Sequence, residues 1–149
     1  MKNILNKDFQ DFLMALNEFN VRYIVVGGYA VIFHGYHRST GDLDIWIERN
    51  EENYNHLLQA FQSFGLALFD MNRQNFLNNA SIDVFTFGVP PVQIDLMLEV
   101  KGLTFEAAYT QSIINEIDNI PIRYLDLRTL KEAKKHSGRH KDLDDLEHL

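Results

Sequence analysis

The segment that most constrains this chain is DLDIWIE, residues 42–48, because it places two aspartates inside a run that otherwise reads as a buried strand. Side chains alternate across a strand, so Asp42 and Asp44 project from one face together with Trp46, while the intervening apolar residues pack on the other. Carboxylates this close repel each other and lose hydration when they are buried. The segment therefore predicts a nearby positive charge, unless one aspartate simply caps or pairs within the fold.

A second segment, VQIDLMLEV at 92–100, repeats this pattern with Asp95 on its polar face. If the two strands are neighbours, Asp95 lies beside Asp42 and Asp44. Three converging carboxylates are strongly destabilising without cations, and Mg²⁺ is a cation that prefers such oxygen ligands. Asp83 is a second candidate for the third carboxylate, ranked below Asp95 because its own strand is less continuously apolar.

Hydrophobic periodicity predicts helices and strands in alternation along the chain. Strands are expected at 22–28, 42–48, 81–88 and 92–100, with a hairpin joining the last two; helices are expected around 9–16, over 29–36, after an Asn50 cap, over 105–112 behind Thr104, and at 127–136 and 141–149. The segment 71–79 is ambiguous, and 113–126 reads as a strand pair or one irregular edge strand. This order predicts an α/β (α+β) fold, a mixed sheet with flanking helices, in one domain over 1–149.

Composition excludes several classes of protein. The net charge of −7 argues against a broad nucleic-acid-binding surface, and the absence of cysteine excludes disulfides and thiolate metal sites. The longest apolar-plus-glycine run, 23–33, has 11 residues, well short of the roughly 20 needed to span a bilayer. The first ten residues do not resemble a signal peptide. We expect a cytoplasmic protein that does not enter the membrane.

The C-terminal region is locally basic. Five cations fall within eleven residues: Lys131, Lys134, Lys135, Arg139 and Lys141. They form either a solvated helix face or a phosphate-binding patch. If the last helix docks through its leucines and folds back over the sheet, Lys141 reaches the aspartate face; otherwise it pairs with Asp144 or Asp145. The histidines of this region are expected to be surface or packing residues rather than zinc ligands.

Gly27 and Gly28 stand where the first strand meets a helix. Such a pair permits close approach of a ligand to the backbone, although it also suits a plain strand-to-helix turn. Arg38 is a candidate phosphate clamp or a partner of Glu48, and Thr40 orients the turn before the strand or touches phosphate. Trp46 either stacks a base or is buried against a neighbouring strand.

Taken together, VGGYAVIFHGYHRSTGDLDIWIE and VQIDLML resemble the nucleotidyltransferase superfamily built on the DNA polymerase β-like fold. The R-x-T-x-D-L-D spelling looks most like the small bacterial group around abortive-infection toxin nucleotidyltransferases, and GRHKDLDDLEHL is similar to a C-terminal helix of that group. The resemblance covers 22–100 well and a helical segment at 126–149 moderately.

The resemblance implies a site and a reaction. Asp42, Asp44 and Asp95 would be catalytic residues that bind two magnesium ions, which manganese could replace. The nucleoside triphosphate would be held by Gly27, Gly28, Arg38, Thr40 and Lys141. A nucleoside monophosphate would pass to a hydroxyl of tRNA, a protein or a small molecule, and an antitoxin partner protein would fit.

Two other functions remain open at this point. One is a non-catalytic nucleotide-binding or antitoxin-like partner module with the same fold, although such a module has no physical need for three converging acids. The other is a glycosyltransferase that uses D-x-D with manganese, for which 149 residues are few.

Overall fold

The computed structural model describes residues 5–37 and 40–149. Within these ranges it has seven helices, α1 (Lys7–Glu18), α2 (Gly27–Phe33), α3 (Glu51–Phe64), α4 (Arg73–Asn78), α5 (Phe105–Gln111), α6 (Leu127–Ser137) and α7 (His140–His148). The strands in the same ranges are β1 (Tyr23–Val26), β2 (Asp42–Ile47), β3 (Val84–Phe87), β4 (Gln93–Met97), β5 (Ile113–Ile117) and β6 (Ile120–Tyr124). None of these helices combines the length and the hydropathy that crossing a membrane requires.

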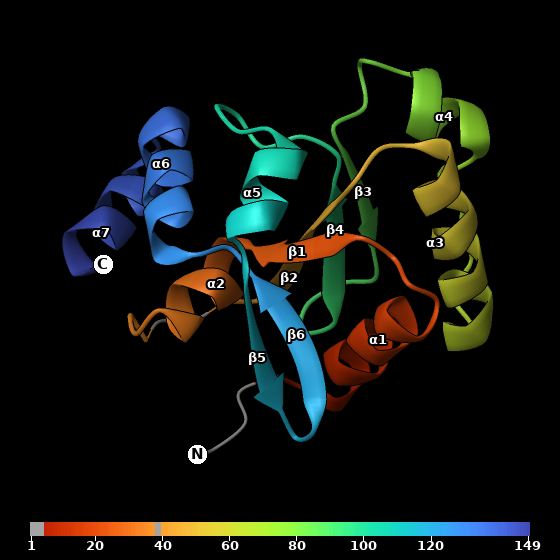
Figure 1. Cartoon of the computed structure of the whole chain (residues 1–149), viewed down its shortest axis with the longest axis horizontal. Helices are drawn as coiled ribbons and strands as arrows, with labels where there is room; N and C mark the ends of the chain where they lie inside the picture. The colour runs from red at the N-terminus through yellow and green to blue at the C-terminus, as the bar shows by residue number, and fades with distance from the viewer. Residues whose placement is uncertain (1–4, 38–39) are drawn as a thin grey trace.

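The strands form one mixed sheet in the order β3-β4-β2-β1-β6-β5 (Figure 1). The central pair β2–β4 is parallel, as is β1–β6, while β1–β2, β3–β4 and β5–β6 are antiparallel. The predicted mixed α/β sheet is therefore confirmed. The two strands that carry the aspartates are neighbours, as the matching alternation required.

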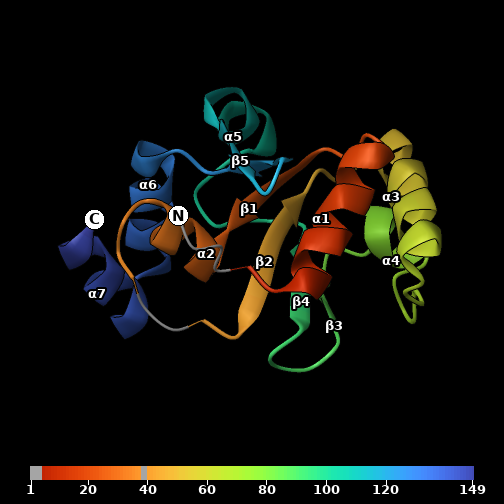
Figure 2. The same ribbon diagram turned by 90° about the horizontal axis from the view of Figure 1, so that it is seen from below.

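One face of the sheet packs against α1 and α3. Leu43 and Ile45 of β2 are fully buried on this face, and so is Leu96 of β4. Phe61 of α3 closes the layer, with ring centroids 5.7 Å from Phe12 of α1 and 5.0 Å from Phe87 of β3. Seen from below, α1 and α3 lie on one side of the strands, and α2, α6 and α7 lie on the other (Figure 2). This core fixes the strands that carry the aspartates.

Local signals account for most element boundaries. Asn50 caps α3 by accepting a hydrogen bond from the Asn53 amide, as expected. The ambiguous segment 71–79 contains α4, which Asn72 caps in the same way. Segment 113–126 is a strand pair, β5–β6, whose two-residue turn at Asp118 and Asn119 has positive φ at both positions.

The closing helices are present, but α7 docks differently from the prediction. Leu149 packs against the core as expected, but Leu143 is 48% exposed, and the fully buried contact is ionic. Lys134 Nζ lies 3.0 Å from Asp142 Oδ1 and 3.0 Å from Asp145 Oδ2, and all three side chains are buried. Lys134 is thus neither a solvated cation nor a phosphate ligand. Because it has two carboxylate partners, it fastens α7 to α6.

We expect Lys134→Ala to lower the free energy of unfolding by about 3–5 kcal/mol, since it leaves two buried carboxylates without their counterion. Denaturant unfolding followed by circular dichroism measures the change. The matched control is Lys135→Ala on the exposed side of the same helix, which we expect to change stability by less than about 0.5 kcal/mol. Equal effects of the two substitutions would contradict the buried ionic contact.

Candidate metal and nucleotide site

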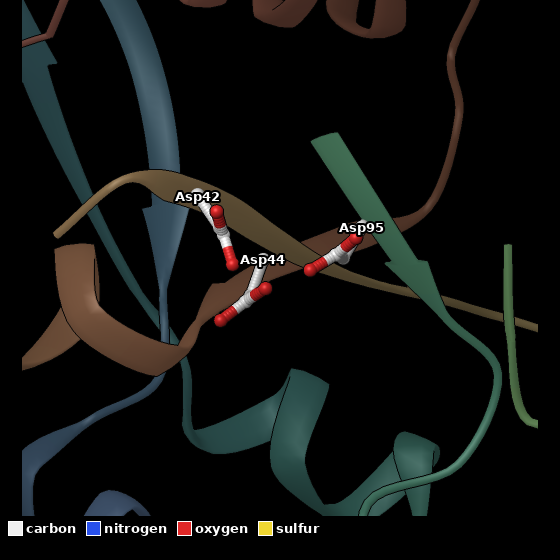
Figure 3. Close-up of side chains that lie close together, drawn as sticks. All are labelled: Asp42, Asp44 and Asp95. Atoms are coloured by element: carbon white, nitrogen blue, oxygen red, sulfur yellow. The ribbon is translucent and has the colours of Figure 1, made fainter. Parts of the chain in front are cut away.

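Three carboxylates converge where β2 and β4 run side by side. Asp44 pairs with Asp95 in the parallel register, and Asp42 lies two residues earlier on the same face of β2. One carboxylate oxygen from each aspartate lies within 4.8 Å of the others. In Figure 3 the three side chains point toward a common space, Asp42 and Asp44 from β2 and Asp95 from β4. Within the described ranges this is the one group of histidine, aspartate and glutamate side chains with such spacing.

The surroundings hold Asp95 in place. Thr86 of β3 donates a hydrogen bond to Asp95 Oδ1 at 2.8 Å, and Gln93 Nε2 donates to the same oxygen at 3.2 Å. Thr86 faces Asp95 in the antiparallel register, so the hairpin supplies this support directly. These contacts orient the Asp95 carboxylate, yet neither partner supplies a positive charge.

The surroundings of Asp44 disfavour its ionised form. Burial, followed by the negative charges of Asp95 and Asp42, raises the pKa of Asp44 to about 7. Lys141 acts in the opposite direction, so its ammonium lies near enough to favour the ionised form. A carboxylate with a raised pKa keeps its proton to higher pH, and a divalent metal ion that binds it displaces that proton.

Gly27 is the residue that makes room for Asp44. It begins α2 with φ at +66°, and a Cβ built on it would overlap Asp44 Oδ2 and lie 2.9 Å from Asp44 Cγ. Only glycine meets both conditions, the left-handed backbone and the absence of a side chain. The sequence predicted close approach at this glycine, and the group that approaches in the structure is Asp44.

A cavity of about 340 Å³ opens from Asp44 toward α6 and α7. Its apolar wall is formed by Val26, Met97, Val100, Leu125, Leu130 and Ala133. Arg139 and Lys101 add cations to the lining, and Gly27 and Asp44 stand at the sheet end. Asp142 holds Arg139 through a 2.7 Å hydrogen bond from Arg139 Nε. Glu99, Lys134 and Asp142 also line the cavity, which therefore combines apolar walls with charges of both signs beside Asp44.

The remaining predicted residues have mixed placements. Thr40 donates a hydrogen bond to the Asp42 main-chain carbonyl at 3.3 Å, which suits a role in the turn. Arg38 lies outside the described residues. Asp83 is exposed, precedes β3 and is not part of the carboxylate group.

Trp46 cannot stack a base, because it is 2% exposed and packs edge-on against Phe105 of α5. His34 is a packing residue, with Nε2 at 2.6 Å from the Leu125 carbonyl oxygen. His148 stacks on Tyr36 at a centroid distance of 4.1 Å. These placements agree with structural roles for the two histidines.

Sequence reasoning missed two contributors to this site. Arg139 was considered only as one of several tail cations, and its position beside Asp44 depends on the Asp142 contact across the α6–α7 turn. Thr86 was missed although the β3–β4 hairpin register, had it been worked out, places it opposite Asp95.

The donor set fits a divalent cation. Carboxylate oxygens are hard ligands of the kind that Mg²⁺ and Mn²⁺ bind, and a raised pKa marks a group whose charge lacks compensation. Asp42, Asp44 and Asp95 are therefore consistent with a divalent metal site.

We expect the pH dependence of stability to reveal Asp44. Its pKa in the folded protein is about 7, above the ordinary value of 3.8, so the folded state binds the extra proton between those values. The free energy of unfolding of metal-free protein should therefore fall as the pH rises from about 4 to 7. Asp44→Asn should raise the melting temperature in EDTA at pH 8.5 and much less at pH 5.5.

Added Mg²⁺ should raise the melting temperature of the parent protein more at pH 8.5 than at pH 5.5, because the metal must displace a proton at low pH. Asp83→Asn is the matched control, an exposed aspartate outside the cluster. If Asp44→Asn and Asp83→Asn show the same pH and Mg²⁺ dependence, the assignment of Asp44 is wrong.

The role of Gly27 is tested against Gly65. Both have positive φ, but a Cβ added at Gly65 would have no atom of the described residues within 4 Å of it. Gly65→Ala should therefore lower stability only through backbone strain, by about 1–2 kcal/mol. Gly27→Ala should lower stability further and weaken Mg²⁺ binding measured by calorimetry. Equal losses of stability with unchanged Mg²⁺ affinity would contradict the close approach to Asp44.

Comparison with known proteins supports the fold. No protein-family model matches the sequence, and no curated protein matches it. Among solved structures, the chain is similar to the crystal structure of TM1012 from Thermotoga maritima, a candidate nucleotidyltransferase, with a TM-score of 0.58 and 14% sequence identity. The match covers 93% of this chain and 88% of the other. The chain therefore has a fold that matches a nucleotidyltransferase fold, and this fold carries a triad of carboxylates.

Proposed function

We propose that this protein is a magnesium-dependent nucleotidyltransferase that moves a nucleoside monophosphate from a nucleoside triphosphate to a hydroxyl group. The observation that carries the proposal is the convergence of Asp42, Asp44 and Asp95 on one end of the paired strands β2 and β4. Three acids held together by a rigid sheet are explained by a cationic ligand, and the fold is that of a candidate nucleotidyltransferase.

In this proposal the three aspartates hold two Mg²⁺ ions, for which Mn²⁺ can substitute. The bound metal supplies positive charge at the entering and leaving oxygens of the reacting phosphate. Asp44 binds it in the ionised form, which the nearby ammonium of Lys141 also favours. Asp95 is held in position by Thr86 and Gln93. This fixed geometry orients the reactants before any bond changes.

The triphosphate is placed between the sheet and the C-terminal helices. Gly27 and Gly28 let the backbone of α2 approach it, and Lys141 together with Arg139 binds its oxygens. Support comes from the influence of both cations on Asp44 and from the position of Arg139 in the cavity lining. Asp142 pairs with Arg139 through Nε and Nη2, which orients the guanidinium beside the cavity and leaves its Nη1 for a phosphate oxygen.

The transfer step is an in-line displacement. The oxygen of the acceptor hydroxyl forms a bond to the α-phosphorus, and the bond from that phosphorus to the bridging oxygen breaks, releasing pyrophosphate. Asp95 receives the hydroxyl proton. The acceptor belongs to RNA, a protein or a small molecule, and the sequence resemblance extends the proposal to a toxin that is controlled by an antitoxin partner.

We expect Asp44→Asn to lower nucleotide transfer by at least about 100-fold, since it removes a charge that the metal and the transition state require. The assay incubates the protein with ATP, CTP, GTP or UTP labelled at the α-phosphate, together with Mg²⁺ and cell extract. Label is then followed into RNA, protein and small molecules.

Asp83→Asn is the control for this assay and should transfer as the parent protein does. Absence of transfer from all four nucleotides, with Mg²⁺ and with Mn²⁺, would contradict the proposed function. So would equal transfer by the two variants.

A further inference from the structure

A second cavity lies at the opposite end of β1 from the carboxylates. Val26 is the residue of β1 that faces Asp44, whereas Tyr23, three residues earlier, lines this other space. Its volume is about 320 Å³, and Arg22, Arg123 and Tyr109 are part of its lining. Arg22 directly precedes β1, Arg123 lies in β6, and Tyr109 lies near the end of α5. The metal and nucleotide site described above uses none of them.

Two arginines contact the same aromatic ring here. The guanidinium carbon of Arg22 lies 4.3 Å from the ring centroid of Tyr109, and that of Arg123 lies 4.1 Å from it. Arg22 is neutralised, because it binds both carboxylate oxygens of Glu48 at 3.0 Å and reaches Glu106 at 3.2 Å. The positive charge of Arg22 is therefore balanced by carboxylates of the protein itself.

Arg123 differs from Arg22 in this respect. Its guanidinium donates one hydrogen bond, from Nη1 to Ser112 Oγ at 2.8 Å, and in the described part of the chain it has no carboxylate within 4.0 Å. Arg49, Arg73 and Arg139 all have such a partner. Arg123 is nevertheless half-buried in a chain of net charge −7.

Because Arg123 is half-buried and has no carboxylate partner among the described residues, its positive charge is available to an anion bound in the cavity. Arg123 lies over the Tyr109 ring, and within the described residues its Nε and Nη2 make no hydrogen bond. The exposed amide of Asn20 lines the same cavity, and within the described residues its side chain makes no hydrogen bond. Several donors thus surround a space with room for more than a single inorganic anion.

We propose that this cavity binds the phosphate group of a small molecule, with Arg123 as its principal ligand and the Asn20 amide as a further donor. A planar guanidinium fork matches the oxygens of a phosphate monoester. The volume beyond the phosphate accommodates an organic part of about the size of a sugar. The proposal is independent of the proposed nucleotide transfer, because the residues that carry it lie at the other end of β1.

The test is a titration of metal-free protein with inorganic phosphate and, separately, with ribose 5-phosphate at constant ionic strength. Binding is followed by the side-chain Nε–Hε signals of the arginines in NMR spectra. We expect saturable shifts of the Arg123 signal and binding that Arg123→Gln weakens by about tenfold or more. Arg128→Gln is the matched control, since Arg128 is exposed on α6 and, among the described ion pairs, also has no carboxylate partner.

The two probes separate the two sources of a phosphate group. Equal affinity for both assigns the site to the free anion, and tighter binding of ribose 5-phosphate assigns it to a phosphorylated small molecule; either result supports the phosphate site. Asp44→Asn should leave the shifts of the Arg123 signal unchanged in both titrations, which separates this cavity from the carboxylate cluster.

Two outcomes would overturn the proposal: the absence of saturable shifts at Arg123 with either probe, or equal weakening by Arg123→Gln and Arg128→Gln. If Arg123→Gln does not fold, Arg123→Lys is used instead. It keeps the positive charge while losing the fork and much of the stacking, so it should also weaken binding by several-fold.

Discussion

The repulsion among Asp42, Asp44 and Asp95 is the constraint around which the rest of the molecule is arranged. Among the described residues, the hydrogen-bond donors to Asp95, Thr86 and Gln93, are uncharged and supply no compensating positive charge. The carboxylates stay close only because β2 and β4 are locked in register by the buried apolar face beneath them. The sheet thus confines charge that would otherwise separate, and a divalent cation is the partner whose chemistry fits that confinement.

A buried ion-pair cluster between α6 and α7 lies beside the three aspartates and positions a cation near them. Lys134, Asp142 and Asp145 form a buried contact that fixes α7 against α6. Asp142 also binds Arg139, whose guanidinium lines the cavity beside Asp44. The C-terminal helices therefore position the Arg139 guanidinium, paired with Asp142, near Asp44. Removing Lys134 would disturb the position of Arg139, because Lys134 fixes the aspartate that holds it.

Much of the fold could be predicted because local patterns agree with tertiary structure. Alternation along 42–48 and 92–100 correctly placed Asp44 and Asp95 on one face, and the matching patterns led to adjacent strands. The strand pair over 113–126 was one of two alternatives. It forms because both of its turn residues, Asp118 and Asn119, tolerate positive φ. Helix periodicity likewise located α1 and α3, whose buried faces are broad.

The errors arose where long-range contacts decide the outcome. Leu143 was expected to dock α7, yet the helix turns its buried aspartates inward because Lys134 is there to meet them. For Trp46 the sequence left base stacking and burial open, and the packing of Phe105 decides for burial. The contact of Gly27 with Asp44 also depends on a turn geometry that the letters GG do not specify. Each case needs the position of a second element.

The most direct test of the account is the location of a bound metal. Crystals grown with Mn²⁺ and a non-hydrolysable nucleoside triphosphate would show Mn²⁺ by its anomalous scattering. The account predicts metal coordinated by oxygens of Asp42, Asp44 and Asp95, with the phosphates between this cluster and Arg139 and Lys141. Nucleotide bound elsewhere, or bound here with no metal on the three carboxylates, would contradict it.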